Sequence, residues 1–482
     1  MGAVTLDLVT HDGAQPASPA VYLEDRSVLT YGELAGSVGE FERALRCDGK
    51  ALVLCAGDRD LPTLLAYLAA LRLGHAVAFL PASEEILSAY QPEFVVPAPG
   101  SGAGLAGLGY GPAAEPVSGV TIFRRENSQP AGDIYADTAL LLATSGSTGS
   151  PKAVRLSYSG LAANTAAVIC ALGITAAERA PTTLPITHAY GLSVLNTHLA
   201  AGAGVVLGGR APLSLAAWDH LVRSGATSFA AVPTTYAAFG PAHVSLLGRS
   251  RIRTMTQSGA RLGEDLTMRL VRMMEQRDGR FFVMYGQTEA TSRIARLDPG
   301  DLPGRLGSVG TAVPGGTITI RPGPGPVHAR AVPGEGAVCY RGPGVMLGYA
   351  AGRADLGRGA EVDVLDTGDL GYLREGYLYL TGRTKRIVKV LGVRTSLDDL
   401  ERLVERAGHP AAVICGTDDV VHLLGAGDAV VHEQQRRQLV ESLGVPSRHV
   451  VFRPVDCLPR TAGGKVDYRA LAAVIDAEER AG

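Results

Sequence analysis

Short apolar stretches alternate with longer amphipathic ones along the first 290 residues. Runs of four or five apolar residues near 51–55, 76–80 and 139–143 flank stretches with helical spacing at 61–73 and 158–172. Strands that alternate with helices through short connections predict a parallel α/β sheet. Further expected elements are a hairpin at 20–30, a helix at 31–46, strands at 204–207, 229–232 and 281–284, and helices at 215–224 and 264–277.

The pattern changes after Gly286, because glycine, proline and short β-type stretches dominate residues 300–382. This predicts a small β-barrel or an antiparallel layer. Mixed α/β character returns from Lys385, with expected strands at 386–390 and 411–415 and helices at 397–406 and 432–443. The expected fold class is therefore α/β, with stacked sheets and a small β-barrel-like layer in a domain at 1–383 and a small α+β domain at 384–482.

Composition excludes several classes of protein. The 482 residues carry a net charge of -2, so no basic excess would attract nucleic acid or an anionic membrane. No apolar run of about 18 residues lacks glycine or charge, which argues against a membrane span. The acidic N-terminal stretch does not resemble a signal peptide. The six cysteines show no CxxC spacing, which disfavours a zinc site or a disulfide framework and fits a reducing cytoplasm.

Lysine is rare, with five residues against 40 arginines. Surface positions tolerate either cation, so a retained lysine points to a place that needs a compact, flexible ammonium. Four of the five lie in the motifs below, and all five are Lys50, Lys152, Lys385, Lys389 and Lys465.

The strongest motif follows the apolar stretch 139–143. It combines small and hydroxyl residues with a basic end: Thr144, Ser145, Gly146, Ser147, Thr148, Gly149, Ser150, Pro151 and Lys152. Glycines allow backbone N–H groups to surround phosphate oxygens, hydroxyls add donors, and the lysine supplies charge. The spacing is not that of a Walker sequence, which disfavours a P-loop kinase. A flexible Ser/Gly linker is the alternative, but linkers rarely follow a buried strand directly.

This loop resembles the signature of the adenylate-forming superfamily, which comprises acyl-CoA synthetases, luciferases and peptide-synthetase adenylation domains. Four further motifs follow in the family's order, so the resemblance covers roughly residues 140–470. It implies a large N-terminal domain and a mobile C-terminal lid domain at 384–482.

The segment Tyr285, Gly286, Gln287, Thr288 and Glu289 resembles the second motif. The resemblance implies that the aromatic ring stacks on adenine, the threonine binds the α-phosphate and the glutamate holds Mg²⁺. A carboxylate is a suitable hard ligand for that ion. Ser258, Gly259 and Ala260 resemble the segment that lines the adenine and acyl pockets.

Two motifs near the expected domain boundary resemble those that read ribose and form the hinge. Asp369 is the expected acceptor for both ribose hydroxyls, and Arg383 is expected nearby. Lys385 takes the hinge position, where many relatives carry aspartate. Lys389 and Gly392 belong to the expected thiol-transfer face, although Thr395 and Ser396 replace the Val-Glu pair usual there.

Lys465 lies in a segment that resembles the C-terminal lysine loop, after Gly463 and Gly464. The resemblance implies that it contacts the substrate carboxylate and the α-phosphate, and makes it catalytic together with Thr288 and Glu289. One phosphate charge at 4 Å attracts an exposed lysine by about 1 kcal/mol and a partly buried one by about 4 kcal/mol.

The acid pocket is expected at His188, Ala189, Tyr190, Gly191, Val232 and Pro233. Amino-acid-activating relatives carry an aspartate at the position of Ala189, where it pairs with the substrate ammonium. An unpaired ammonium in an apolar pocket is costly, so an aryl or acyl acid is expected. His188 is interpreted either as a gate or as a packed histidine at a strand end.

The expected reaction joins a small carboxylic acid to AMP with release of pyrophosphate, followed by transfer to a pantetheine thiol. The expected cofactors are ATP and Mg²⁺, with CoA or the phosphopantetheine of an acyl or peptidyl carrier protein as acceptor. The alternatives are an amine-type nucleophile or nitrite as acceptor, with N–N bond formation, and a non-catalytic nucleotide-binding pseudoenzyme. A monomer or homodimer is expected, and composition and resemblance favour an enzyme of bacterial secondary metabolism.

Overall fold

The computed structural model describes residues 5–126, 132–143, 152–322, 332–390, 393–405, 411–415, 420–426, 429–443, 445–461 and 464–481. The chain forms two compact units. Unit 1 comprises Met1–Leu306, Ala312–Thr317 and Tyr340–Leu365, and unit 2 comprises Gly307–Thr311, Ile318–Cys339 and Asp366–Gly482. Unit 2 thus extends beyond the expected domain at 384–482, and a hinge at that boundary stays a prediction.

The largest sheet of unit 1 has eight strands. Their order is β19 (Gly348–Ala350), β9 (Ala153–Ser157), β8 (Thr138–Ala143), β4 (Ala76–Phe79), β3 (Leu52–Cys55), β5 (Phe94–Val96), β7 (Phe123–Arg125) and β6 (Tyr110–Pro112). The strands β8, β4, β3 and β5 pair in parallel, as the alternating pattern predicts. β3 and β4 are buried along their whole length, which explains their unbroken apolar sequence.

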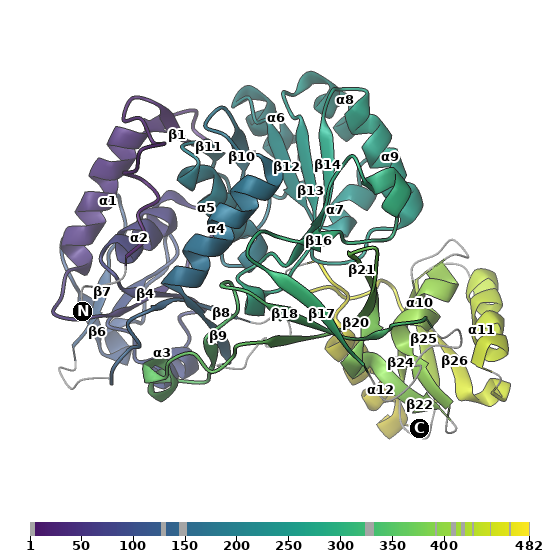
Figure 1. Cartoon of the computed structure of the whole chain (residues 1–482). Coiled ribbons are helices and arrows are strands. Elements are labelled where there is room, and N and C mark those ends of the chain that lie inside the picture. Colours follow the sequence, from purple (N-terminus) through teal and green to yellow (C-terminus); the bar gives the residue numbers. More distant parts are fainter. Residues whose placement is uncertain are drawn as a thin grey trace. The chain divides into compact units, whose positions relative to one another are not determined.

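Two smaller sheets complete unit 1. The five-stranded sheet has the order β12 (Ser228–Ala231), β13 (Thr254–Gln257), β14 (Arg280–Tyr285), β15 (Ala295–Leu297) and β16 (Thr311–Ala312). The four-stranded sheet has the order β10 (Arg179–Pro181), β11 (Gly204–Val206), β1 (Pro19–Tyr22) and β2 (Val28–Thr30). β1 and β2 form the predicted hairpin. Figure 1 shows β12, β13 and β14 side by side, with α9 along one side of them.

The helices of unit 1 cover these sheets. They are α1 (Tyr31–Leu45), α2 (Leu61–Arg72), α3 (Glu84–Tyr90), α4 (Tyr158–Leu172), α5 (Ala189–Ala200), α6 (Leu215–Arg223), α7 (Pro233–Ala237), α8 (Pro241–Arg249) and α9 (Glu264–Glu275). Side-chain caps fix where several helices begin. Thr30 and Glu33 form a capping box on α1, and Asp60 and Ser157 cap the N-termini of α2 and α4. α4 ends at Gly173, which adopts the left-handed conformation (φ 64°).

Unit 2 holds most of a four-stranded sheet and a small α/β layer. The four-stranded sheet has the order β17 (Thr317–Pro322), β18 (Gly336–Arg341), β20 (Leu365–Arg374) and β21 (Tyr377–Arg383). Its outer strands are β17 and β21, so the β-rich region forms a layer and not a closed barrel.

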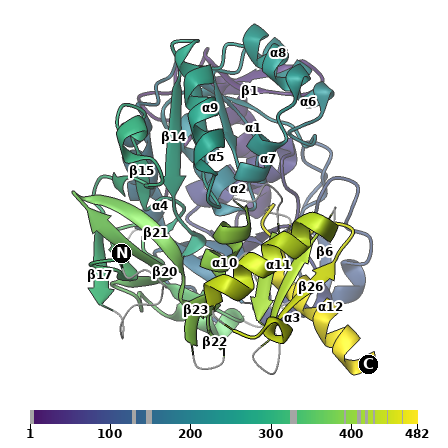
Figure 2. The ribbon, with the colours of Figure 1, turned by 90° about the vertical axis from the view of Figure 1, so that its right-hand side faces the viewer.

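The rest of unit 2 contains two sheets and three helices. These are β22 (Ile387–Val390), β23 (Val393–Ser396), β24 (Ala411–Cys415), β25 (Val421–Gly425), β26 (Val450–Pro454), α10 (Leu397–Glu405), α11 (Ala429–Leu443) and α12 (Tyr468–Ala481). Figure 2 shows α11 alongside β26. An apolar core from α10, α11 and the β24–β26 sheet, including Leu400, Val413 and Leu439, holds this layer together.

Candidate active site

The predicted phosphate loop connects two neighbouring strands of the largest sheet. β8 and β9 pair antiparallel, with Ala143 opposite Ala153, so the two ends of the loop lie at the same end of the sheet. The candidate residues Thr144, Ser145, Gly146, Ser147, Thr148 and Gly149 lie outside the described residues. Lys152 is described and exposed, directly before β9.

Lys152 and Glu289 both contact Tyr349. The Lys152 Nζ lies 3.7 Å from the centre of the Tyr349 ring, and the Tyr349 hydroxyl donates to Glu289 Oε1 across 3.1 Å. Tyr349 reaches this place because β19 pairs with β9, with Tyr349 opposite Val154. Burial and the neighbouring Glu289 raise the pKa of Tyr349 to about 12, so its hydroxyl remains a donor at neutral pH. The structure therefore joins two predicted site residues through a third that the sequence analysis missed.

The motif that contains Glu289 forms a strained turn between β14 and β15. Thr291 and Ser292 have positive φ angles of 55° and 112°, which non-glycine residues rarely adopt. A Cβ on Gly286 would lie 1.6 Å from the Ser292 carbonyl oxygen, so only glycine fits. Such strain persists where the surrounding structure determines the conformation, and it is concentrated at functional sites.

The residues before and after Glu289 are held by this turn. Thr288 starts a 3₁₀ turn (Thr288–Ala290), and Met346 donates its backbone N–H to the Glu289 carbonyl across 2.9 Å. Tyr285 ends β14 and is 8% exposed. Its stacking on adenine stays a prediction.

Two predicted pocket segments meet at one edge of the five-stranded sheet. β12 and β13 are parallel neighbours, so Val232 and Ser258 follow their carboxyl ends at the same edge. A Cβ on Gly259 would lie 3.3 Å from Val232 Cγ1, and Gly259 has a φ of 97°. Gln257 Nε2 donates to the Ala260 carbonyl across 2.6 Å and closes this turn. Pro233 is the first residue of α7.

The predicted acid-pocket segment starts α5. His188 is the N-cap residue and is exposed, so its interpretation as a packed histidine at a strand end is wrong. Ala189 and Tyr190 open the helix and are half-buried. Gly191 allows a close approach, since a Cβ there would lie 2.1 Å from the Pro185 carbonyl oxygen.

The Tyr190 side chain is fixed at both ends. Its hydroxyl donates to the Thr256 carbonyl across 2.9 Å, and the Arg293 guanidinium lies 3.8 Å from the ring centre. Arg293 is 2% exposed. The sequence analysis missed Arg293, although its place four residues after Glu289 was visible. A buried arginine cannot be distinguished from an exposed one by sequence spacing.

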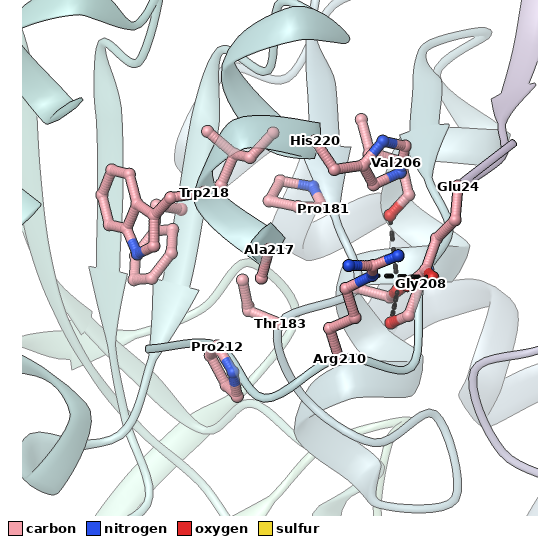
Figure 3. Close-up of a pocket in the computed structure, with 13 residues that line it drawn as sticks. Glu24, Pro181, Thr183, Val206, Gly208, Arg210, Pro212, Ala217, Trp218 and His220 are labelled. Atoms are coloured by element: carbon pink, nitrogen blue, oxygen red, sulfur yellow. Dashed lines mark hydrogen bonds and ion pairs between the residues drawn. The ribbon is translucent and has the colours of Figure 1, made fainter. Parts of the chain in front are cut away.

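A further pocket lies in unit 1. α6 covers it, and its walls combine apolar residues with an ion pair between Glu24 and Arg210 at 2.9 Å (Figure 3). It is lined by Glu24, Pro181, Thr182, Thr183, Val206, Gly208, Arg210, Pro212, Ala217, Trp218, His220, Leu221 and Phe229. None of these residues was a predicted site residue.

Unit 2 brings together the two predicted ribose residues. Asp369 on β20 lies opposite Arg383 on β21, and Arg383 Nε donates to Asp369 Oδ1 across 3.0 Å. Asp369 is 6% exposed. Asp398 accepts from the Arg383 backbone N–H at 2.9 Å, so the end of β21 is fixed within unit 2.

The predicted hinge lies in a 3₁₀ turn, Thr384–Arg386, that follows β21. Arg386 is held by Asp398 at 2.5 Å and Glu401 at 2.8 Å, and its guanidinium lies 3.8 Å from the Tyr468 ring centre. Lys385 lies in this turn and Lys389 in β22, and Gly392 lies outside the described residues. Their roles stay predictions.

The described residues of the predicted lysine loop, on either side of 462–463, are hydrogen-bonded to one another within unit 2. Thr461 donates its backbone N–H to the Lys465 carbonyl across 2.8 Å, and Gly464 donates to Thr461 across 2.8 Å. Gly464 has a φ of 76°, and Arg460 donates to its carbonyl at 3.0 Å. Lys465 is half-buried at the end of this turn.

Comparison with known proteins identifies the family. The model of a family described as AMP-binding enzyme matches residues 109–350, about half of the chain. The chain belongs to the AMP-binding enzyme family. It is thus an AMP-forming acid ligase by family, as the resemblance implied.

Relatives in this family include several CoA ligases. An oxalate–CoA ligase from Arabidopsis thaliana is 30% identical over 356 residues, which cover 70% of this chain and 67% of that protein. An indoleacetate–CoA ligase from Aromatoleum aromaticum is 29% identical over 96% of this chain and 97% of that protein. The non-ribosomal peptide synthetase CmlP from Streptomyces venezuelae is 30% identical over 92% of this chain and 46% of that protein.

A solved structure shares the fold. The o-succinylbenzoate CoA synthetase of Bacillus subtilis, in complex with its acyl-adenylate intermediate, has a TM-score of 0.73. It is 23% identical, and the match covers 95% of this chain and 96% of that one. The expected fold class of the family is confirmed.

The carboxylates of the described residues show which kind of metal site this chain can form. No group of three or more His, Cys, Asp or Glu side chains that could hold a metal occurs among them. Mg²⁺ commonly binds through one or two carboxylates together with substrate phosphates, so it does not need such a cluster. The Glu289 carboxylate and the Lys152 ammonium contact the same side chain, Tyr349. Across the described part of the chain, no helix has the length and apolar composition needed to cross a membrane.

Proposed function

We propose that the enzyme joins a carboxylic acid to AMP, with release of pyrophosphate, and then transfers the acyl group to a pantetheine thiol of CoA or a carrier protein. The observation that carries this proposal is the Lys152–Tyr349–Glu289 cluster. It places the cation that ends the glycine-rich loop beside the motif carboxylate. A cation and a metal-binding carboxylate next to each other suit a site for a magnesium-bound triphosphate.

The residues of unit 1 have separate roles in this proposal. Loop residues 144–149 donate backbone N–H and hydroxyl groups to phosphate oxygens, and Lys152 neutralises charge. Thr288 binds the α-phosphate, Tyr285 stacks on adenine, and Glu289 holds Mg²⁺, which neutralises the departing pyrophosphate when bound. Positioning and charge neutralisation carry the in-line attack of the acid carboxylate on the α-phosphorus. Ser258, Gly259 and Ala260 line the adenine and acid sites.

Unit 2 supplies the ribose site and the lysine of the adenylation step, Lys465. Asp369 accepts from the ribose hydroxyls, and its hydrogen bond with Arg383 orients the carboxylate for that purpose. Lys465 serves the adenylation step and then leaves by rotation about Lys385. The segment from Lys389 to Gly392 takes its place for thiol transfer. A C-terminal domain at 384–482 that alternates between these two states is part of the proposal.

The substrate is an aryl or acyl acid and not an α-amino acid. Ala189 supplies no carboxylate at the start of α5 for an ammonium group, and Val232 and Pro233 add apolar wall. The CoA-ligase relatives, which act on oxalate and indoleacetate, agree with an acid that lacks an α-amine. The match to CmlP keeps a carrier protein as a possible acceptor. A cytoplasmic monomer or homodimer is the expected state.

Acid-dependent pyrophosphate release across a library of carboxylic acids, with and without CoA, tests this function. We expect release with aryl or acyl acids and a faster turnover when CoA is present. Glu289→Gln, which removes the charge and keeps the shape, is the control and is expected to lose release. Binding of ATP without release for any acid indicates a pseudoenzyme, and efficient exchange with α-amino acids alone contradicts the substrate assignment.

A further inference from the structure

Arg293 is a buried cation without a counter-charge among the described residues. It is 2% exposed, and none of the described carboxylates forms an ion pair with it or acts on its charge. Its neighbour is the Tyr190 ring, whose centre lies 3.8 Å from the guanidinium carbon. A cation–π contact offsets only part of the cost of removing a charge from water.

The contrast with the other buried arginines of unit 1 is clear. Arg155 pairs with Glu361, and Arg353 pairs with Glu93 at 2.8 Å. Buried charges in proteins are usually paired in this way because an unpaired charge is strongly destabilising. Arg293 departs from that rule in the same protein, which points to an anion that arrives with a ligand.

The turn that carries Arg293 holds further unsatisfied polar atoms. Gln287 Nε2, Ser292 Oγ and Arg293 Nε are all buried, and none of them has a hydrogen-bond partner in the part of the chain that the structure describes. Such atoms are rare in folded proteins, and each one calls for a ligand, a water or an ion. Three of them on one strained turn match a site for a group rich in acceptor oxygens.

The position of this turn favours the acid over the nucleotide as the ligand. Tyr190 belongs to the predicted acid-pocket segment, and its hydroxyl is bound to Thr256 at the end of the strand that leads to Gly259. Arg293 packs on the ring of Tyr190 in this segment, whereas Lys152 packs on the ring of Tyr349. A cation here also repels an ammonium group, in agreement with the absence of an aspartate at position 189.

We propose that Arg293 binds a second carboxylate of the substrate, so that the enzyme activates a dicarboxylic acid. This inference rests on the proposed acid activation and deepens it. One carboxylate attacks the α-phosphorus of ATP and displaces pyrophosphate. The other does not react and forms an ion pair with the Arg293 guanidinium. A site built around such a charge rejects acids that lack it, because the guanidinium is then left unpaired.

The test compares malonate, succinate and isophthalate with their monomethyl esters. We expect kcat/KM for pyrophosphate release to be at least about 100-fold higher for the best diacid than for its ester. Arg293→Met removes the charge and keeps a side chain of similar length. It is expected to lower kcat/KM for the diacid at least about 100-fold, while kcat/KM for the ester stays the same or rises. Arg293→Lys is expected to restore part of the diacid activity. Arg296→Met, three residues later, is the matched control and leaves the preference unchanged.

Thermal unfolding supplies a readout that does not depend on turnover. The diacid is expected to raise the melting temperature of the wild type but not of Arg293→Met, because only the wild type offers it a cation. Without ligand, Arg293→Met is expected to melt higher than the wild type, since an uncompensated buried charge is gone.

These outcomes separate the two proposals. Release with monocarboxylic acids and an unchanged preference in Arg293→Met would overturn the diacid inference while the activation of acids stands. A variant whose KM for ATP rises equally with every acid would also overturn it, because Arg293 then serves the nucleotide. Protection of the wild type alone by a diacid, without pyrophosphate release from any acid, supports the site and contradicts the proposed reaction.

Discussion

Tyr349 donates its phenolic hydrogen to Glu289 across 3.1 Å. The same ring carries the Lys152 ammonium at 3.7 Å, so one side chain positions both charged groups. A hydrogen bond to a metal-binding carboxylate fixes its orientation, and the loss of such a bond typically costs 10- to 100-fold in metal affinity or activity.

Tyr349→Phe should therefore weaken the response to Mg²⁺. The phenylalanine keeps a ring beneath Lys152 but leaves Glu289 without the phenolic donor. We expect the Mg²⁺ concentration for half-maximal pyrophosphate release to rise about 10-fold. Tyr22→Phe, which removes a hydroxyl from a ring that packs on Arg179, is the control. An unchanged Mg²⁺ dependence in Tyr349→Phe would show that Glu289 needs no such orientation.

Lys465→Ala should separate the two half-reactions. If Lys465 serves only the first, the variant loses adenylation by about 100- to 1,000-fold and keeps transfer from supplied acyl-AMP to CoA. Single-turnover assays of each half measure this. Arg469→Ala removes an exposed cation four residues later and should change neither half. Equal loss of both halves in Lys465→Ala would refute the division of labour.

Gly286→Ala should disrupt the turn that carries Glu289. An alanine Cβ would lie 1.6 Å from the Ser292 carbonyl oxygen, so the backbone must move. We expect the free energy of unfolding to fall by about 3 kcal/mol and pyrophosphate release to be lost. The control is Gly36→Ala, an exposed site within α1 with open space around it, which should gain about 0.5–1 kcal/mol. Denaturant unfolding of both variants measures the difference, and equal stabilities would contradict the account.

The lowered pKa of Lys50 should make the stability of the protein depend on pH. Its ammonium donates to the carbonyls of Gly74 at 2.7 Å and Ala136 at 2.9 Å, and burial lowers its pKa to about 8 from 10.5. Between these values the unfolded chain binds more protons than the folded chain, so stability rises with pH.

The expected result is that the free energy of unfolding of the wild type increases relative to that of Lys50→Met from about pH 8 to about pH 10.5. Denaturant titrations at each pH supply the comparison. Two parallel curves would show that the Lys50 pKa is not lowered in the folded state.

Much of the fold was readable from local pattern. The parallel strands β3, β4 and β8 were predicted because both faces of each are buried and their apolar runs are short and unbroken. The helix α5 was missed. It is buried among other elements and so lacks a polar face, and its tyrosine, glycine, threonine and asparagine are weak helix formers.

The site was readable only where chemistry is concentrated in consecutive residues. Glu289 and Asp369 stand in short motifs, so their types and spacing identify them. Tyr349 does not, because strand pairing brings it to Glu289 across a long sequence separation. Arg293 does not, because its spacing from Glu289 gives no sign that its side chain is buried. Lys50 is the opposite case, because a sequence signal pointed to a residue outside the site. The scarcity of lysine drew attention to it, and in the structure its ammonium donates to two backbone carbonyls.

The path of one oxygen atom tests the central claim most directly. An acid that supports pyrophosphate release, labelled with ¹⁸O in its carboxylate, is incubated with the enzyme, ATP and CoA, and the AMP is analysed by mass spectrometry. Attack of the carboxylate on the α-phosphorus predicts one ¹⁸O atom in AMP for each acyl group transferred. Unlabelled AMP, or label in inorganic phosphate, would contradict formation of an acyl-adenylate.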